Sequence, residues 1–162
     1  MSHAGTLPHQ LGRHNFEICL RAVAECDIYF GIISPLYGSG REEAGGQSIT
    51  HTELLRAIEL DRPRYLLAHE KVAMVRRVLM DLGYEDATKR STLKFVKRGA
   101  VIDDLRLIDM YEAATREGIP VGDRKDHWVQ QYRTDAEVLR YVSVQFGNQQ
   151  QVRKMLEDKD DR

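Results

Sequence analysis

The hydrophobic positions of the chain alternate between helical spacing and short continuous runs. Phe16, Cys19, Leu20 and Val23 follow the i, i+3, i+4, i+7 spacing that places apolar side chains on one face of a helix. Residues 27–33 form a nearly continuous apolar run that is rich in β-branched and aromatic residues. Such a run predicts a strand covered on both faces, as in a parallel sheet.

The same two patterns recur to the end of the chain. The further predicted elements are a helix that opens at 48–53 and ends before Pro63, a strand over 64–68, a helix over 72–82, a strand over 128–132 and a helix over 134–146. Helices that alternate with short apolar strands imply right-handed βαβ crossovers and a parallel sheet. The mixed pattern of residues 84–127 leaves that segment open.

Composition indicates one ordinary α/β domain. The chain has 162 residues, 42% of them hydrophobic and 30% charged, with a net charge of -1, which favours neither disorder nor a globally nucleic-acid-binding surface. The expected organisation is a loose leader over 1–13, a single domain over 14–156 and a charged, frayed tail over 157–162.

The two cysteines and the hydropathy pattern bear on the environment of the protein. Cys19 and Cys26 lie about two helical turns apart, roughly 10 Å, which is too far for a disulfide across an intact helix. We therefore expect two free thiols. No signal segment opens the chain, and no apolar run approaches the roughly 18 residues that a membrane helix needs. The expected location is the cytoplasm, with no membrane partner.

A polar, glycine-rich segment over residues 34–47 follows the first predicted strand. In open parallel sheets, ligands bind beyond the carboxyl ends of the strands, and the next helix would offer its N-terminal amides to a phosphate or carboxylate. Ser34, Tyr37, Gly38 and Ser39 are therefore candidate ligand contacts. The spacing matches neither G-x-G-x-x-G nor a P-loop, so the local pattern favours a plain connector over a ligand loop.

Glu53 lies in the first turn of the helix that follows this loop. A carboxylate there could stabilise an oxocarbenium-like sugar cation or act as a nucleophile on an N-glycosidic bond. However, Thr50-x-x-Glu53 is also the spacing of a capping box, which recurs at Thr134-x-x-Glu137, where no chemistry is suggested. The local pattern alone favours capping.

Ser48, Thr50 and His51 stand beside Glu53 and are further candidate ligand contacts. His51 and Glu53 could be imagined as metal ligands, but no third ligand follows at a recognisable spacing. We therefore expect no metal.

A basic cluster raises the question of nucleic acid. It consists of Lys89, Arg90, Lys94, Lys97 and Arg98. Such a cluster can contact phosphates, but acidic residues stand just before it, which favours a solvated protein face. No nucleic-acid partner is expected.

Several segments together resemble an uncharacterised bacterial domain family. They are the strand and loop at 25–33 (ECDIYFGII) and 37–39 (YGS), the helix start at 48–53 (SITHTE), Ala57-Ile58 and Arg62-Pro63. That family is similar to the TIR and nucleoside 2-deoxyribosyltransferase group of flavodoxin-like folds. The match covers about residues 16–82, and Arg62-Pro63 departs slightly from the family's commoner Lys-Pro.

The resemblance implies a flavodoxin-like three-layer α/β sandwich with a short parallel sheet, which serves in bacterial signalling or defence. It implies a nucleotide-type ligand, with NAD or a nucleoside as substrate and no cofactor. In catalytic relatives the glutamate that opens this helix is the nucleophile or transition-state carboxylate, and by motif that residue is Glu53. The alternative is a non-catalytic interaction or assembly module with the same fold.

One departure from the family concerns the start of the fold. The family opens with a buried strand and a serine-rich turn, and here only the leader over 1–13 stands in their place. We therefore expect the first strand to be missing and the sheet to have an exposed edge beside residues 28–33. Because exposed apolar edges invite pairing, a homodimer or a strand-donating partner is expected.

Overall fold

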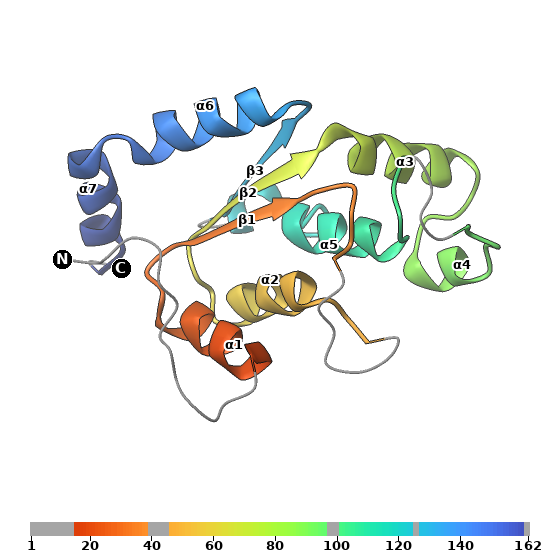
Figure 1. Cartoon of the computed structure of the whole chain (residues 1–162), viewed down its shortest axis with the longest axis horizontal. Helices are drawn as coiled ribbons and strands as arrows, with labels where there is room; N and C mark the ends of the chain where they lie inside the picture. The colour runs from red at the N-terminus through yellow and green to blue at the C-terminus, as the bar shows by residue number, and fades with distance from the viewer. Residues whose placement is uncertain (1–14, 39–45, 97–100, 125–126, 161–162) are drawn as a thin grey trace.

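The computed structural model describes residues 15–38, 46–96, 101–124 and 127–160. Its centre is a parallel sheet of β1 (Tyr29–Ile33), β2 (Arg64–His69) and β3 (His127–Tyr132), in the order β1-β2-β3. Helices lie on both sides of the sheet (Figure 1). The predicted α/β sandwich with a short parallel sheet is confirmed.

The helices complete the alternation that the apolar pattern predicted. They are α1 (Asn15–Glu25), α2 (Ile49–Glu59), α3 (Glu70–Asp81), α4 (Ala87–Ser91), α5 (Arg106–Thr115), α6 (Asp135–Phe146) and α7 (Gln149–Asp160), with a short 3-10 turn at Val121–Asp123. In the described part of the chain no helix is both long and apolar enough to cross a membrane. Gly147 ends α6, and α7 continues to Asp160 through part of the segment expected to fray.

The main core lies between the sheet and α2, α3 and α5. Every second residue of the central strand β2 faces this core, where Leu66 is 1% exposed and Ala68 is fully buried. Leu107 and Ile108 of α5 are buried against the same face. Each Å² of apolar surface that is buried stabilises the fold by about 25 cal/mol. This side of the sheet is therefore the main source of stability.

The segment that the sequence left open is held by one buried cation. Arg90 of α4 is 3% exposed, and its guanidinium donates to Asp109 (2.7 Å) and Glu112 (2.7 Å) of α5. Because a buried charge is costly unless it is paired, these carboxylates fix α4 against α5. Two helices of the segment left open by its mixed pattern are thus joined by ion pairs between residues about 20 positions apart.

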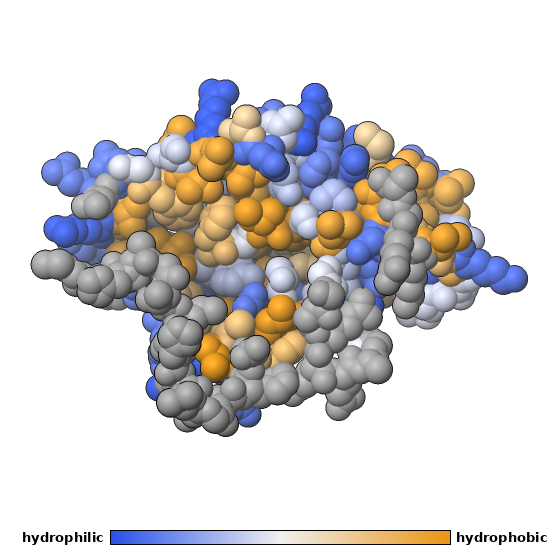
Figure 2. Space-filling model, in the orientation of Figure 1, coloured by the Kyte–Doolittle hydropathy of each residue, from blue (hydrophilic) through white to orange (hydrophobic). Residues whose placement is uncertain are grey.

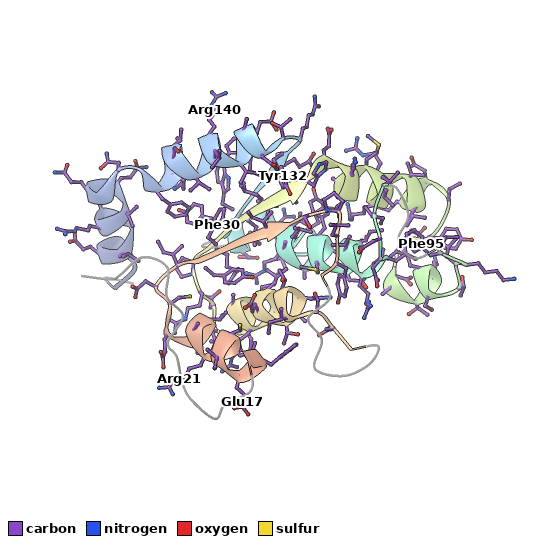
Figure 3. The ribbon with its side chains drawn as sticks, in the orientation of Figure 1. Glu17, Arg21, Phe30, Phe95, Tyr132 and Arg140 are labelled. Atoms are coloured by element: carbon purple, nitrogen blue, oxygen red, sulfur yellow. The ribbon has the colours of Figure 1, made fainter. Side chains whose placement is uncertain are left out.

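The helix α1 packs beside α2, near the start of β1. Its outer face carries Glu17 and Arg21, which point away from the sheet (Figure 3). At its carboxyl end, the Arg62 guanidinium donates a hydrogen bond to the Ala24 carbonyl oxygen. The turn between α2 and β2 thus holds α1 in place.

The strand β1 differs from the prediction of a strand covered on both faces. Tyr29 and Ile33 are buried, whereas Phe30 is 37% exposed and Ile32 is 39% exposed. Phe30 contacts Phe146 of α6, with 5.7 Å between ring centroids, but α6 covers only part of this face. β1 also ends the sheet order, so among the described strands only β2 pairs with it.

Gly31 in the middle of β1 gives the first testable prediction. A Cβ atom at this position would lie 2.8 Å from Leu66 Cδ2 and 3.0 Å from the Tyr29 ring. We expect Gly31→Ala to lower the free energy of unfolding by about 1–3 kcal/mol, the usual cost of overpacking a core. Chemical denaturation checks this, with Gly118→Ala as the control, because nothing lies within 4 Å of that added Cβ. Equal effects of the two substitutions would contradict the packing around β1.

Candidate functional site

Tyr37, in the loop after β1, is the centre of a buried hydrogen-bond network. Its side chain is 2% exposed, and its hydroxyl lies 2.7 Å from His51 Nδ1. The backbone N–H of Ser48 donates to the same hydroxyl oxygen at 3.3 Å. The simplest arrangement has the Tyr37 hydroxyl donating to a neutral His51 that carries its proton on Nε2.

The start of α5 holds this loop from the other side. The Arg106 guanidinium lies 4.4 Å from the centroid of the Tyr37 ring and donates to the Gly46 carbonyl at 2.8 Å. It is itself fixed by Asp104, at 3.0 and 2.7 Å, and Asp103 accepts the Tyr37 backbone N–H at 2.7 Å. The network therefore binds both described ends of the loop to α5.

The remaining candidates in this loop have local roles or lie outside the description. Ser34 Oγ donates to the Leu36 carbonyl at 2.9 Å and accepts the Leu36 N–H at 3.2 Å, which closes a tight turn. Gly38 has a φ of 85°, a conformation that glycine adopts without a steric cost. Ser39 lies outside the described residues.

The helix α2 begins two residues earlier than a cap at Thr50 would require. Ser48 is the N-cap, with extended backbone and an Oγ that accepts the His51 N–H at 3.3 Å. The predicted Thr50-x-x-Glu53 capping box is therefore wrong, because both residues already lie inside the helix. Ser48 occupies the N-cap position in place of Thr50, so Glu53 has no capping role.

The second Thr-x-x-Glu spacing, Thr134 and Glu137 at the start of α6, does form a cap. Thr134 Oγ1 accepts the Glu137 N–H at 3.3 Å, and the Glu137 carboxylate accepts the Arg133 N–H at 2.6 Å. Glu137 thus returns to the backbone, one residue before the N-cap. Two identical spacings therefore have different roles in the folded chain.

Glu53 lines a hollow beside the outer edge of β1. The hollow measures about 360 Å³ and is bounded by Cys19 and Ala22 of α1, by Cys26 just after that helix, by β1, and by Thr50 and Glu53 of α2. The structure therefore divides the predicted site in two. Thr50 and Glu53 face the edge of the sheet, whereas Tyr37, Ser48 and His51 belong to the buried network.

The electrostatic surroundings of the Glu53 carboxyl are unusual for a helix surface. Burial raises the pKa of Glu53, and a hydrogen bond from the Cys19 thiol offsets part of that increase. The pKa values of Cys19 and Tyr29 are also raised, first by burial and then by the Glu53 charge. Among the ion pairs of the described residues, none involves Glu53. The negative charge of an ionised Glu53 is thus not balanced by an ion pair among these residues, and a cationic partner would stabilise it.

Sequence reasoning missed the residues that support the candidate positions. Cys19 belongs to the helical stripe that the sequence predicts, and its spacing gives no sign of the contact with Glu53. Asp104 and Arg106 fall within residues 84–127, whose pattern predicts no single element, and they reach the Tyr37 network only through tertiary folding. No local signal could have assigned either role.

Two residues of the basic cluster form ion pairs within the protein. Lys89 pairs with Glu85 at 2.5 Å, and Arg90 is the buried cation between α4 and α5. Lys94 is exposed, and Lys97 and Arg98 lie outside the described residues. Within the described ranges, no group of three or more His, Cys, Asp and Glu side chains could hold a metal ion. Cys19 and Cys26 form no disulfide, as their spacing predicted.

The buried His51 gives a prediction for the pH dependence of stability. Burial lowers the pKa of His51 below its ordinary value of about 6.5, so the folded state resists protonation that the unfolded chain accepts. The stability that His51 contributes is present above about pH 6.5 and is lost as the pH falls toward the folded pKa. We expect His51→Gln to have a shallower loss of unfolding free energy between about pH 7 and 5, measured by denaturant titration. A slope unchanged by the substitution would contradict a neutral, buried His51.

Comparisons with known proteins place the whole chain in one family. A family model described as a domain of unknown function, DUF4062, matches residues 3–159. Neither the curated proteins nor the solved structures give a match to the chain. The match spans all the described strands and the residues of both the hollow and the Tyr37 network. The chain therefore belongs to the DUF4062 family.

Proposed function

We propose that the protein binds a nucleotide-type ligand, NAD or a nucleoside, in the hollow beside β1. The observation that carries the proposal is Glu53, whose carboxyl lines this hollow and takes no part in capping α2. The sequence resemblance to the TIR and deoxyribosyltransferase group supports the same residue independently. A role in bacterial signalling or defence stays a prediction of that resemblance.

The chemistry that fits Glu53 is cleavage of an N-glycosidic bond. When the bond between the sugar C1′ and the base nitrogen breaks, its electron pair leaves with the base and positive charge develops on the sugar. A partly desolvated carboxylate stabilises such a cation more strongly than it would in water. Water then adds at C1′, and the proton that it releases passes to the departing base of a nucleoside, or to solvent when neutral nicotinamide leaves NAD. Thr50 lines the same hollow, and we assign its hydroxyl to a hydrogen bond with the sugar.

The second candidate is a non-catalytic assembly module with the same fold. It is favoured by the Tyr37 network, because Tyr37, Ser48 and His51 are already bonded to one another. On this interpretation the loop after β1 is a structural connector, and the exposed edge of β1 is the functional surface.

Glu53→Gln separates the two candidates. The purified protein is incubated with NAD and with nucleosides, and release of the free base is followed by chromatography. If Glu53 is the reacting carboxylate, Glu53→Gln should lower turnover by about 100-fold or more. Glu137→Gln, at the capping glutamate of α6, should leave turnover unchanged. Equal turnover by wild type and Glu53→Gln would contradict the catalytic role, and absence of turnover in the wild type would favour the assembly module.

The stabilities of the alanine variants check the same assignment. Glu137→Ala should lower the free energy of unfolding by about 0.5–2 kcal/mol if the cap is lost, a range taken from N-cap substitutions. Glu53→Ala should not show this loss of a cap, because Ser48 caps α2. Thermal or chemical denaturation measures both variants. A Glu53→Ala loss that matches Glu137→Ala would restore the capping interpretation.

A further inference from the structure

We propose that β1 pairs with β1 of a second copy of the chain. In this arrangement the two strands run antiparallel around a two-fold axis at Gly31, so that two sheets join into one. The proposal does not depend on the chemistry of Glu53. It concerns the backbone and side chains of five residues, Tyr29–Ile33.

The backbone of β1 presents a regular set of groups at this edge. The Tyr29 N–H donates to the Pro63 carbonyl at 2.8 Å, which directs the backbone groups of Tyr29 toward β2. In a parallel ladder the residues that bond to one neighbour alternate along the strand, so Gly31 and Ile33 also face β2. The N–H and C=O groups of Phe30 and Ile32 therefore point outward, where no described strand pairs with them.

The side chains of β1 are self-complementary in an antiparallel pair. Pairing centred on Gly31 places Phe30 opposite the partner's Ile32, an aromatic and β-branched combination that stabilises antiparallel sheets. The outward N–H and C=O groups of Phe30 then exchange both hydrogen bonds with those of the partner's Ile32. The two Gly31 residues meet at the close, non-hydrogen-bonded spacing, where the absence of side chains avoids crowding.

The described surface around this edge is apolar. β1 is the strand nearest the viewer in Figure 1, and Figure 2 shows apolar side chains gathered on the same face of the molecule. Phe30 and Ile32 are 37% and 39% exposed, and the strand contains no charged residue or proline. Edge strands that avoid association usually carry such residues, so this edge is suited to pairing.

The second copy is favoured over an unrelated strand by this register. Any extended peptide could satisfy the outward backbone groups, but Tyr29–Ile33 offers its own copy apolar partners on both sides of a central glycine. The same pairing would close the hollow that contains Glu53, because Phe30, Gly31 and Ile32 form one wall of it. Self-association would then limit access to the candidate ligand site.

Sedimentation of the full chain over a range of concentrations tests the pairing. We expect a reversible dimer, and we expect Ile32→Lys to weaken it by about tenfold or more, since a lysine on an edge strand opposes pairing. Leu139→Lys is the matched control, because Leu139 is 69% exposed and belongs to α6, not to the strand that pairs. That variant should form the dimer as the wild type does.

Amide hydrogen exchange of the wild type tests the register without any substitution. Protection of the Phe30 and Ile32 amides should rise with protein concentration, whereas the Tyr29 and Gly31 amides should be protected at all concentrations. A protein that stays monomeric at every concentration would overturn the proposal. A dimer in which the Phe30 and Ile32 amides remain unprotected, or one weakened equally by Leu139→Lys, would also overturn it.

Discussion

The one-sided pairing of β1 is the constraint on which the rest of the site depends. Because β2 takes the backbone groups of alternate residues, the outward groups of Phe30 and Ile32 are left at the edge of the described sheet. The space beside this edge is bounded by α1, which Arg62 holds beside α2. The hollow and the partly buried Glu53 follow from this arrangement, and the incomplete cover by α6 adds the exposed side chains of Phe30 and Ile32.

The start of α2 decides which residues share that hollow. Successive residues of a helix are separated by about 100°, so His51 and Glu53 lie about 200° apart around the helix axis. With Ser48 as the N-cap, His51 faces the Tyr37 network and Glu53 faces the edge of β1. A helix that began at Thr50 would have placed the Glu53 carboxylate beside its own backbone amides. The position of one cap therefore separates the buried Tyr37 network from the hollow that contains Glu53.

The strands and their crossovers could be predicted from the sequence because they depend on local periodicity. The Thr50 cap could not be distinguished from the Ser48 cap, since both residues carry a hydroxyl and the choice depends on how Ser48 packs beneath Tyr37. Local spacing also could not show that α6 leaves Phe30 and Ile32 partly exposed. The contacts of Arg90 and Arg106 join residues far apart in the chain, so they appear only in the folded structure.

The central claim is that Glu53 is a partly buried carboxyl in an open hollow and not a helix cap. Its most direct test is a pH titration of the Glu53 side-chain carboxyl carbon by NMR. A carboxylate that accepts backbone N–H groups has a lowered pKa, whereas a desolvated one without such donors has a raised pKa. We predict a midpoint above the ordinary glutamate value of about 4.3. A midpoint at or below that value would contradict the account.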